Sequence, residues 1–392
     1  MGSVSGRDRV DTMSNMSDRD VAIVLSGGGV NGVLLELGFL RRLRASALWP
    51  RVGAIYGTSA GALTGTMAAL DRLDDLEEFM LELQPRDVFA PQRLWQLPLN
   101  GLHHYALPAT IAARLTDPLE LARGLAEAPI EVVVFTTDVT EQDEESYELV
   151  HSSHETPPEV MAQAMLASAA ISALVLPLPV ADRIATDGGW VRNFPLGPAL
   201  ERPGVGLVVA FRHLPRYPHV GAEPLVRLRA RLQRFRAVPP VRALIAQLEE
   251  AEARERRGEP VHLGDMLARL MRVTIQQNTA LEERLAAERE AACGELDALR
   301  VDVLELVREH ARPGRRSRAR RAVEERFART ALPRSVPTIV VRGSAGPDGL
   351  EHGLRESPEW TEHAKRTVIA RGWKAADSEL RAYDARLLEQ AS

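Results

Sequence analysis

The fold is decided by residues 21–70, which read VAIVLSGGGVNGVLLELGFLRRLRASALWPRVGAIYGTSAGALTGTMAAL. An apolar run is followed by three glycines and then by a stretch with apolar residues at helical spacing. The second half has the same order of apolar run, turn and helical stretch, with GTSAG as the turn. We predict strands at 21–25 and 52–56, and helices at 33–44 and 62–70. Two consecutive strand–helix units predict a parallel sheet.

Later segments extend this sheet. Residues 130–137 (IEVVVFTT) are too rich in β-branched side chains for anything but a buried strand. We also predict a helix at 158–170, a strand at 175–180, and two further central strands at 206–211 and 336–341. Between the last two strands, residues 220–332 are dominated by Arg, Glu, Ala and Leu, which indicates several amphipathic helices.

Together these segments predict an α/β fold with a mostly parallel central sheet and one helical insertion. We divide the chain into a flexible N-terminal segment (1–20), a core (21–219), the insertion (220–332), and a C-terminal strand and helices that complete the core (333–392).

The composition is that of a soluble globular protein. With 45% hydrophobic residues the 392-residue chain can bury a substantial core, and its net charge of -5 gives no reason to propose nucleic acid as a partner. Residues 1–20 lack the apolar core of a secretory signal. The longest uncharged stretch, 160–181, contains two prolines and fits a buried helix and strand better than a membrane span. The single Cys293 fits a reducing compartment, so we expect a cytoplasmic protein.

GTSAG at residues 57–61 is a G-x-S-x-G pentapeptide between a predicted strand and a predicted helix. That context is typical of a nucleophile elbow. Gly57 and Gly61 allow a sharp turn, from which Ser59 projects at the helix N-terminus, where negative charge is favoured. The alternative is a serine in an ordinary turn between a strand and a helix.

A serine nucleophile needs a nearby base and hydrogen-bond donors for the oxyanion that forms after attack. Gly27, Gly28 and Gly29 leave backbone amides uncovered and can serve as these donors. Because this loop and the elbow follow successive strands, we expect them at one edge of the sheet. With Gly32 the loop also spells the dinucleotide fingerprint G-x-G-x-x-G, but the second strand ends in Tyr56 and lacks the acid that holds a ribose.

These motifs resemble the patatin-like phospholipases. The glycine loop, GTSAG, ASAA at 167–170, and DGGW at 187–190 followed by Asn193 and Pro195 stand in the family's order. The resemblance spans about 21–215, and 336–380, with RGW at 371–373, looks like the family's closing strand and helix. It implies a three-layer α/β/α sandwich and a lipid acyl hydrolase of the phospholipase A, lysophospholipase or esterase type. Such an enzyme uses a Ser-Asp dyad and an acyl-serine intermediate, without histidine, metal or cofactor.

The resemblance assigns the nucleophile to Ser59, the base to Asp187 and the oxyanion hole to Gly27, Gly28 and Gly29. Gly188 and Gly189 would let the backbone approach closely, and burial beside a serine would raise the pKa of Asp187 towards neutrality. The implied partner is a lipid or acyl ester, reached by peripheral contact with the inner face of the membrane.

Two positions depart from the family pattern. Asn31 stands where the family usually has Arg or Lys, so one positive charge near the oxyanion is absent. Ser172 stands where the family usually has proline, which affects the shape of the pocket wall.

Alternatives stay open at this stage. An α/β-hydrolase could use Ser59, Asp138 and a late histidine, His213 or His219. A protein that keeps the fold as a scaffold or lipid-binding module, with the insertion mediating assembly, is the non-catalytic alternative. The basic cluster RPGRRSRARR at 312–321 indicates a solvated helix start or a contact with anionic headgroups.

Overall fold

The computed structural model describes residues 19–91, 103–140, 146–170, 175–214, 223–257, 263–329, 335–346 and 360–391. The chain divides into two compact units, one formed by residues 1–214 with 278–392 and the other by residues 215–277. Ser172, His219 and nearly all of the predicted N-terminal segment 1–20 lie outside the described residues.

The larger unit is built on a mixed sheet with the strand order β10-β9-β1-β2-β5-β8-β7, in which β6 pairs additionally with β5. The strands are β1 (Val21–Leu25), β2 (Val52–Thr58), β5 (Glu131–Asp138), β6 (Glu148–Ser152), β7 (Leu178–Val180), β8 (Arg183–Asp187), β9 (Leu207–His213) and β10 (Thr338–Gly343). The run from β10 to β5 is parallel, whereas β6, β7 and β8 are antiparallel to their neighbours. The short strands β3 (Phe89–Pro91) and β4 (His103–Tyr105) form a separate hairpin.

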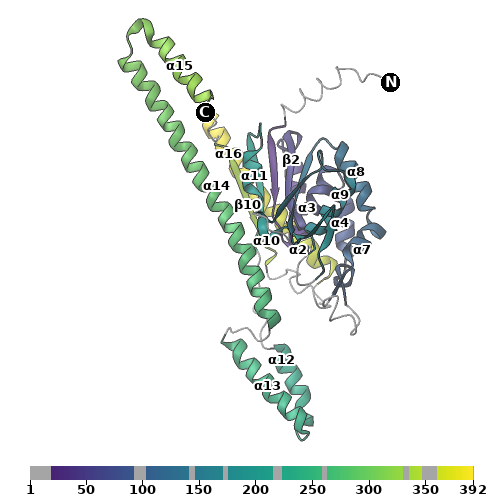
Figure 1. Cartoon of the computed structure of the whole chain (residues 1–392). Coiled ribbons are helices and arrows are strands. Elements are labelled where there is room, and N and C mark those ends of the chain that lie inside the picture. Colours follow the sequence, from purple (N-terminus) through teal and green to yellow (C-terminus); the bar gives the residue numbers. More distant parts are fainter. Residues whose placement is uncertain are drawn as a thin grey trace, which may run out of the picture. The chain divides into compact units, whose positions relative to one another are not determined.

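Helices cover both faces of this sheet (Figure 1). Successive side chains of a strand point to opposite faces, so Val21, Ile23 and Leu25 of β1 join a large core cluster, and Ala22 and Val24 join a smaller one.

The large cluster packs against α2 (Gly29–Arg44), α3 (Ala60–Ala69), α4 (Leu73–Glu82), α5 (Pro85–Val88), α7 (Leu107–Arg114), α8 (Pro118–Glu127), α9 (Pro158–Ser168) and α16 (Glu362–Ala391). The smaller cluster packs against α11 (Leu196–Glu201) and part of α14 (Leu263–His310). The predicted three-layer α/β/α arrangement is confirmed.

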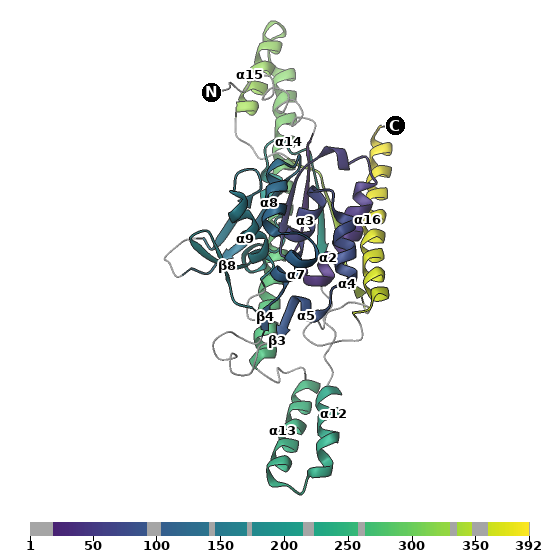
Figure 2. The same cartoon turned by 90° about the vertical axis from the view of Figure 1, so that its right-hand side faces the viewer.

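The C-terminal helix α16 lies alongside α2 at backbone contact (Figure 2). A Cβ on Gly38 would lie 2.0 Å from the Ile369 carbonyl oxygen, and one on Gly372 would lie 1.9 Å from the Leu35 carbonyl oxygen. The glycine of the RGW motif is therefore a contact point between two helices.

One strand prediction was wrong. Residues 336–341 were expected to form a central strand, but β10 is the edge strand of the sheet and its side chains are only partly covered. An apolar run fits both positions, so its hydropathy could not distinguish them. The inner place belongs to β9, which lies between β10 and β1.

Between β9 and β10 the described chain is helical. The elements are α12 (Glu223–Leu232), α13 (Pro239–Arg256), α14 and α15 (Arg316–Arg329). The second unit holds α12, α13 and the start of α14, but from Asn278 onward α14 belongs to the unit of the sheet. In the part of the chain that the structure describes, no helix combines the length and the hydropathy needed to cross a bilayer.

Candidate active site

β2 and β8 meet end to end along one edge of β5. β2 pairs with residues 131–135 of β5 in parallel, and β8 pairs with residues 136–138 in the antiparallel sense. β6 pairs with residues 133–137, so it occupies the opposite edge and leaves β2 and β8 on the same one. Ser59 follows the last residue of β2, and Asp187 is the last residue of β8. The strand register therefore brings the two together.

Ser59 stands at a strained turn. It caps α3 with φ 54° and ψ −117°, a conformation that L-residues rarely adopt and that points to function where it occurs. The turn needs its glycines, because a Cβ on Gly57 would lie 2.4 Å from the Gly61 carbonyl oxygen, and one on Gly61 would lie 2.5 Å from that of Leu25. This is the geometry of a nucleophile elbow.

The Ser59 hydroxyl donates to the carboxylate of Asp187, with 2.7 Å between Oγ and Oδ2. The other carboxylate oxygen accepts from the Gly189 amide at 2.7 Å. Ser59 is 5% and Asp187 7% exposed. Burial raises the pKa of Asp187 to about 6, while the hydrogen bonds from Ser59 and Gly189 act in the opposite direction. Asp187 therefore has a pKa above that of a solvated aspartate while it accepts the hydrogen bond from Ser59.

Sequence reasoning missed several side chains that hold this pair in place. Ser168, in the ASAA motif, accepts from the Ser59 amide at 2.9 Å and donates to the Phe135 carbonyl oxygen at 2.7 Å. Thr137 donates to the backbone oxygen of Asp187 at 2.8 Å. The motif was visible in the sequence, but its role required the fold, because Ser168 lies far along the chain from the serine that it supports.

The glycine loop forms the N-terminus of α2, which begins at Gly29 rather than at the predicted residue 33. The Gly28 and Gly29 amides belong to the first turn, whose amides lack partners within the helix, and both residues are partly exposed. The Gly27 amide was expected to be one of the oxyanion donors, but the structure shows it in another hydrogen bond. It is buried and donates to the Asn193 carbonyl oxygen at 2.9 Å, so it is already engaged.

The remaining motif glycines allow close packing around the loop. A Cβ on Gly32 would lie 3.0 Å from that of Ala60, which brings the first turns of α2 and α3 together. A Cβ on Gly188 would lie 2.3 Å from the Phe135 carbonyl oxygen. Asn31 is buried in the same turn of α2. The first turns of the two helices therefore lie in contact, and the N-terminus of a helix favours negative charge.

An apolar pocket adjoins the serine. Ser59 lines it together with Gly29, and the pocket continues between α3, α4, α7, α8 and α9. Its walls include the side chains of Leu63, Met67, Met80, Ile111, Leu121 and Met165. Since Met67 follows Ala60 by seven residues on α3, the lining extends about 10 Å along that helix at about 1.5 Å per residue.

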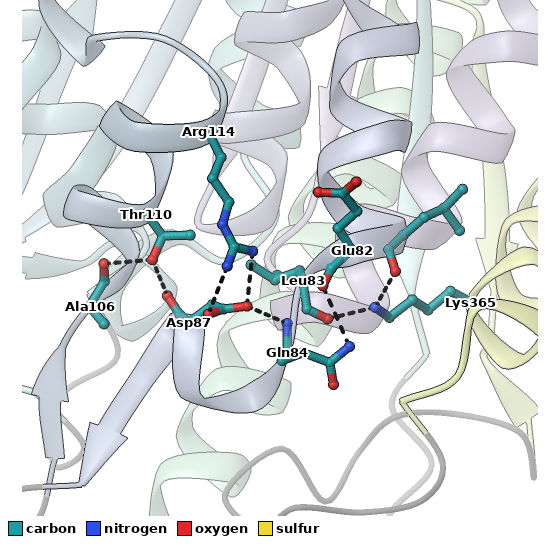
Figure 3. A network of polar contacts seen from close by, with 9 residues as sticks. Glu82, Leu83, Gln84, Asp87, Ala106, Thr110, Arg114 and Lys365 are labelled. Atoms are coloured by element: carbon teal, nitrogen blue, oxygen red, sulfur yellow. Dashed lines mark hydrogen bonds and ion pairs between the residues drawn. The ribbon is translucent and has the colours of Figure 1, made fainter.

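A polar network holds one wall of this pocket (Figure 3). Lys365 of α16 donates to the carbonyl oxygens of Leu81 at 2.8 Å and Leu83 at 2.6 Å, at the end of α4. Asp87 accepts from the Gln84 amide at 2.8 Å and pairs with Arg114 of α7 at 3.1 Å. Leu83 itself lines the pocket, so the network connects α4, α5, α7 and α16 beside it and favours a preformed cavity.

The histidine-dependent alternative finds no matching geometry in the described residues. Asp138 pairs with Arg183 at 3.3 Å and accepts from the Thr140 amide at 2.8 Å. His213 is buried at the end of β9, where burial lowers its pKa to about 4. Its Nδ1 lies 2.8 Å from the point that a Cβ on Gly28 would occupy, so it packs on the glycine loop. The second candidate, His219, lies outside the described residues. Within the ranges given above, no cluster of three or more His, Cys, Asp or Glu side chains could hold a metal ion.

Comparison with known proteins gives three findings. The family model described as patatin-like phospholipase matches residues 23–200. The crystal structure of VipD from Legionella pneumophila is similar at 13% identity and a TM-score of 0.40, over 92% of this chain and 67% of that chain. No curated protein sequence matches the chain. The matched segment contains the glycine loop, the elbow and Asp187, and over residues 23–200 the chain is similar to the patatin-like phospholipase family.

Proposed function

We propose that this protein hydrolyses lipid acyl esters, with Ser59 as nucleophile and Asp187 as base. The observation that carries the proposal is the 2.7 Å hydrogen bond from Ser59 Oγ to Asp187 Oδ2, beside an apolar pocket and two helix N-termini. A carboxylate whose pKa is about 6 is largely ionised at neutral pH and is a stronger base than a solvated aspartate.

In the first half of the proposed reaction, Ser59 Oγ attacks the ester carbonyl carbon and its proton passes to Asp187 Oδ2. The amides of Gly28 and Gly29 donate to the oxyanion, which the dipoles of α2 and α3 also stabilise. We leave Gly27 out of this donor set because its amide is engaged with Asn193. When the intermediate collapses, the leaving alcohol takes the proton from Asp187 and the acyl group remains on Ser59.

In the second half, Asp187 takes a proton from water, whose oxygen attacks the acyl-Ser59 carbonyl carbon. The same donors hold the second oxyanion. Collapse releases the carboxylic acid and returns the proton to Ser59 Oγ, so the cycle needs neither histidine nor cofactor.

The pocket supports a fatty acyl group as the part of the substrate that is recognised. Its lining is almost entirely apolar, and each methylene buried there contributes about 0.8 kcal/mol. Such substrates reside in membranes, so the proposal includes peripheral contact with a lipid surface.

The test is covalent labelling with a fluorophosphonate probe, followed by hydrolysis of a soluble acyl ester. Wild type should be labelled at Ser59 and should turn over the ester, whereas Ser59→Ala should do neither. A folded wild-type protein that is neither labelled nor active would contradict the proposed ester hydrolysis and would favour the alternative of a lipid-binding module. Comparing lipid extracts treated with wild type or Ser59→Ala then identifies the substrate.

A further inference from the structure

The first turns of α14 within the larger unit contact the segment that follows Asp187. Asn278 donates through its side chain to the Trp190 carbonyl oxygen, and Glu282 pairs with Arg192. Glu282 also accepts from the Gly197 amide at 3.1 Å. These α14 residues lie outside residues 23–200, the part of the chain that matches the family model. The contacts place α14 beside the segment that carries Asp187 and Asn193.

Asn193 is the point at which α14 reaches the glycine loop. Its backbone oxygen accepts from the Gly27 amide at 2.9 Å, and its side-chain Nδ2 donates to Thr279 Oγ1 at 3.0 Å. Its side-chain oxygen lies 2.3 Å from the place of a Cβ on Gly27 and 3.1 Å from that of one on Gly189. Asn193 thus lies between the glycine loop and Gly189, whose amide donates to the Asp187 carboxylate.

Both partners of this hydrogen bond are buried, Asn193 at 6% and Thr279 at 1% exposure. A buried amide donor that loses its acceptor has no water to replace it, so Asn193 would have to move or remain unsatisfied. If Asn193 moves, the acceptor of the Gly27 amide moves with it, and this displaces the donors at Gly28 and Gly29. Oxyanion donors act through their placement, and small displacements reduce the rate.

We infer that Thr279 is a positioning residue of the catalytic site: through Asn193 it fixes the glycine loop that binds the oxyanion. This inference rests on the proposed ester hydrolysis. It makes α14, a helix of the insertion, part of the working site. Because the oxyanion forms only in the reaction, the effect should fall on kcat and leave KM unchanged.

The decisive variant is Thr279→Val, which keeps the side-chain shape and removes the acceptor. We expect kcat for a soluble ester, per serine titrated with the fluorophosphonate, to fall about ten-fold or more with KM within two-fold. Thr279→Ser, which keeps the hydroxyl, should restore most of the loss. The matched control is Thr274→Val on the same helix, where the hydroxyl donates to the Leu270 carbonyl oxygen at 3.0 Å, and it should behave as wild type.

A Thr279→Val enzyme with wild-type kcat would overturn the inference while leaving the proposed function intact. A wild-type protein without esterase activity would contradict both the inference on Thr279 and the proposed function. A serine variant as slow as the valine variant would also count against it, because packing and not the hydrogen bond would then be responsible. Should Thr279→Val fail to fold, Thr279→Cys offers a weak acceptor of similar size and must show the same loss in kcat.

Discussion

Asp187 combines a raised pKa with direct contact to Ser59, the proposed nucleophile, and this predicts how the rate depends on pH. Below its pKa of about 6 the carboxyl group already holds a proton and cannot accept one from Ser59. We expect kcat/KM for a soluble ester to rise about ten-fold per pH unit below 6 and to level off above it. Steady-state kinetics between pH 4.5 and pH 9 check this, and a profile that is flat down to pH 5 would contradict it.

The same residue should make the protein less stable above its pKa of about 6 than at lower pH. Burial raises the Asp187 pKa from 3.8 to about 6, so the folded state binds this proton more tightly than the unfolded state. The favourable contribution is complete below pH 3.8 and is lost as the pH rises through about 6. Asp187→Asn should therefore unfold with a free energy up to about 3 kcal/mol higher than wild type at pH 8.

Urea denaturation of both proteins at pH 8 and pH 4 measures this difference. The advantage of Asp187→Asn should shrink towards zero at the lower pH, and we expect the variant to be inactive at both pH values. Equal stability of the two proteins at pH 8 would mean that the carboxylate is better solvated than its 7% exposure indicates.

At the scale of elements, the pocket beside α3 should determine which acyl chains are accepted. Leu63 lies one helical turn beyond Ser59 and is only partly buried, so a larger side chain there can fill the pocket near the serine. For Leu63→Trp we expect kcat/KM to fall at least about ten-fold for a palmitoyl ester and less than two-fold for an acetyl ester. Leu63→Met, of similar volume, is the control, and an equal loss on both esters would indicate general damage to the fold.

The sequence predicted those elements whose signal is local. The units around residues 21–70 carry a buried strand, a glycine turn and a helix within a few residues of one another, and all were found. β6 and β8 were missed because they are short and partly polar, and their pairing with β5 is antiparallel and distant in the chain. The turn between β7 and β8 contains Ala181 at φ 54°, where a glycine would have indicated it.

The same distinction holds within the site. Ser59, Asp187 and the glycine loop could be proposed as site residues from the sequence because motifs mark them. The engagement of the Gly27 amide and the contact of Thr279 with Asn193 depend on tertiary structure alone, since Thr279 lies in a stretch of ordinary amphipathic helix.

At the scale of the whole molecule, the arginines of residues 312–321 are expected to contact anionic lipid. Six arginines and no acid lie in this stretch, and Arg312, Arg315 and Arg318 are exposed. Each basic residue near an anionic surface contributes about 1 kcal/mol, so replacing these three by Gln should weaken vesicle binding about 100-fold. Co-sedimentation with phosphatidylserine-containing vesicles measures this, and phosphatidylcholine vesicles provide the uncharged comparison. Hydrolysis of a soluble ester should not change, and undiminished binding would exclude the cluster as a lipid contact.

The order of strands in the sheet also affects how the chain folds while it is being synthesised. β1 is buried and pairs on one side with β2, which follows at once, but on the other side with β9, which begins only at Leu207. During synthesis the apolar strand β1 therefore has one unpaired edge until β9 has been made. Unpaired strand edges promote aggregation between chains. A fragment that stops at residue 200, where the family match ends, should precipitate when expressed although it contains the glycine loop, the elbow and Asp187, whereas the full chain should stay in solution.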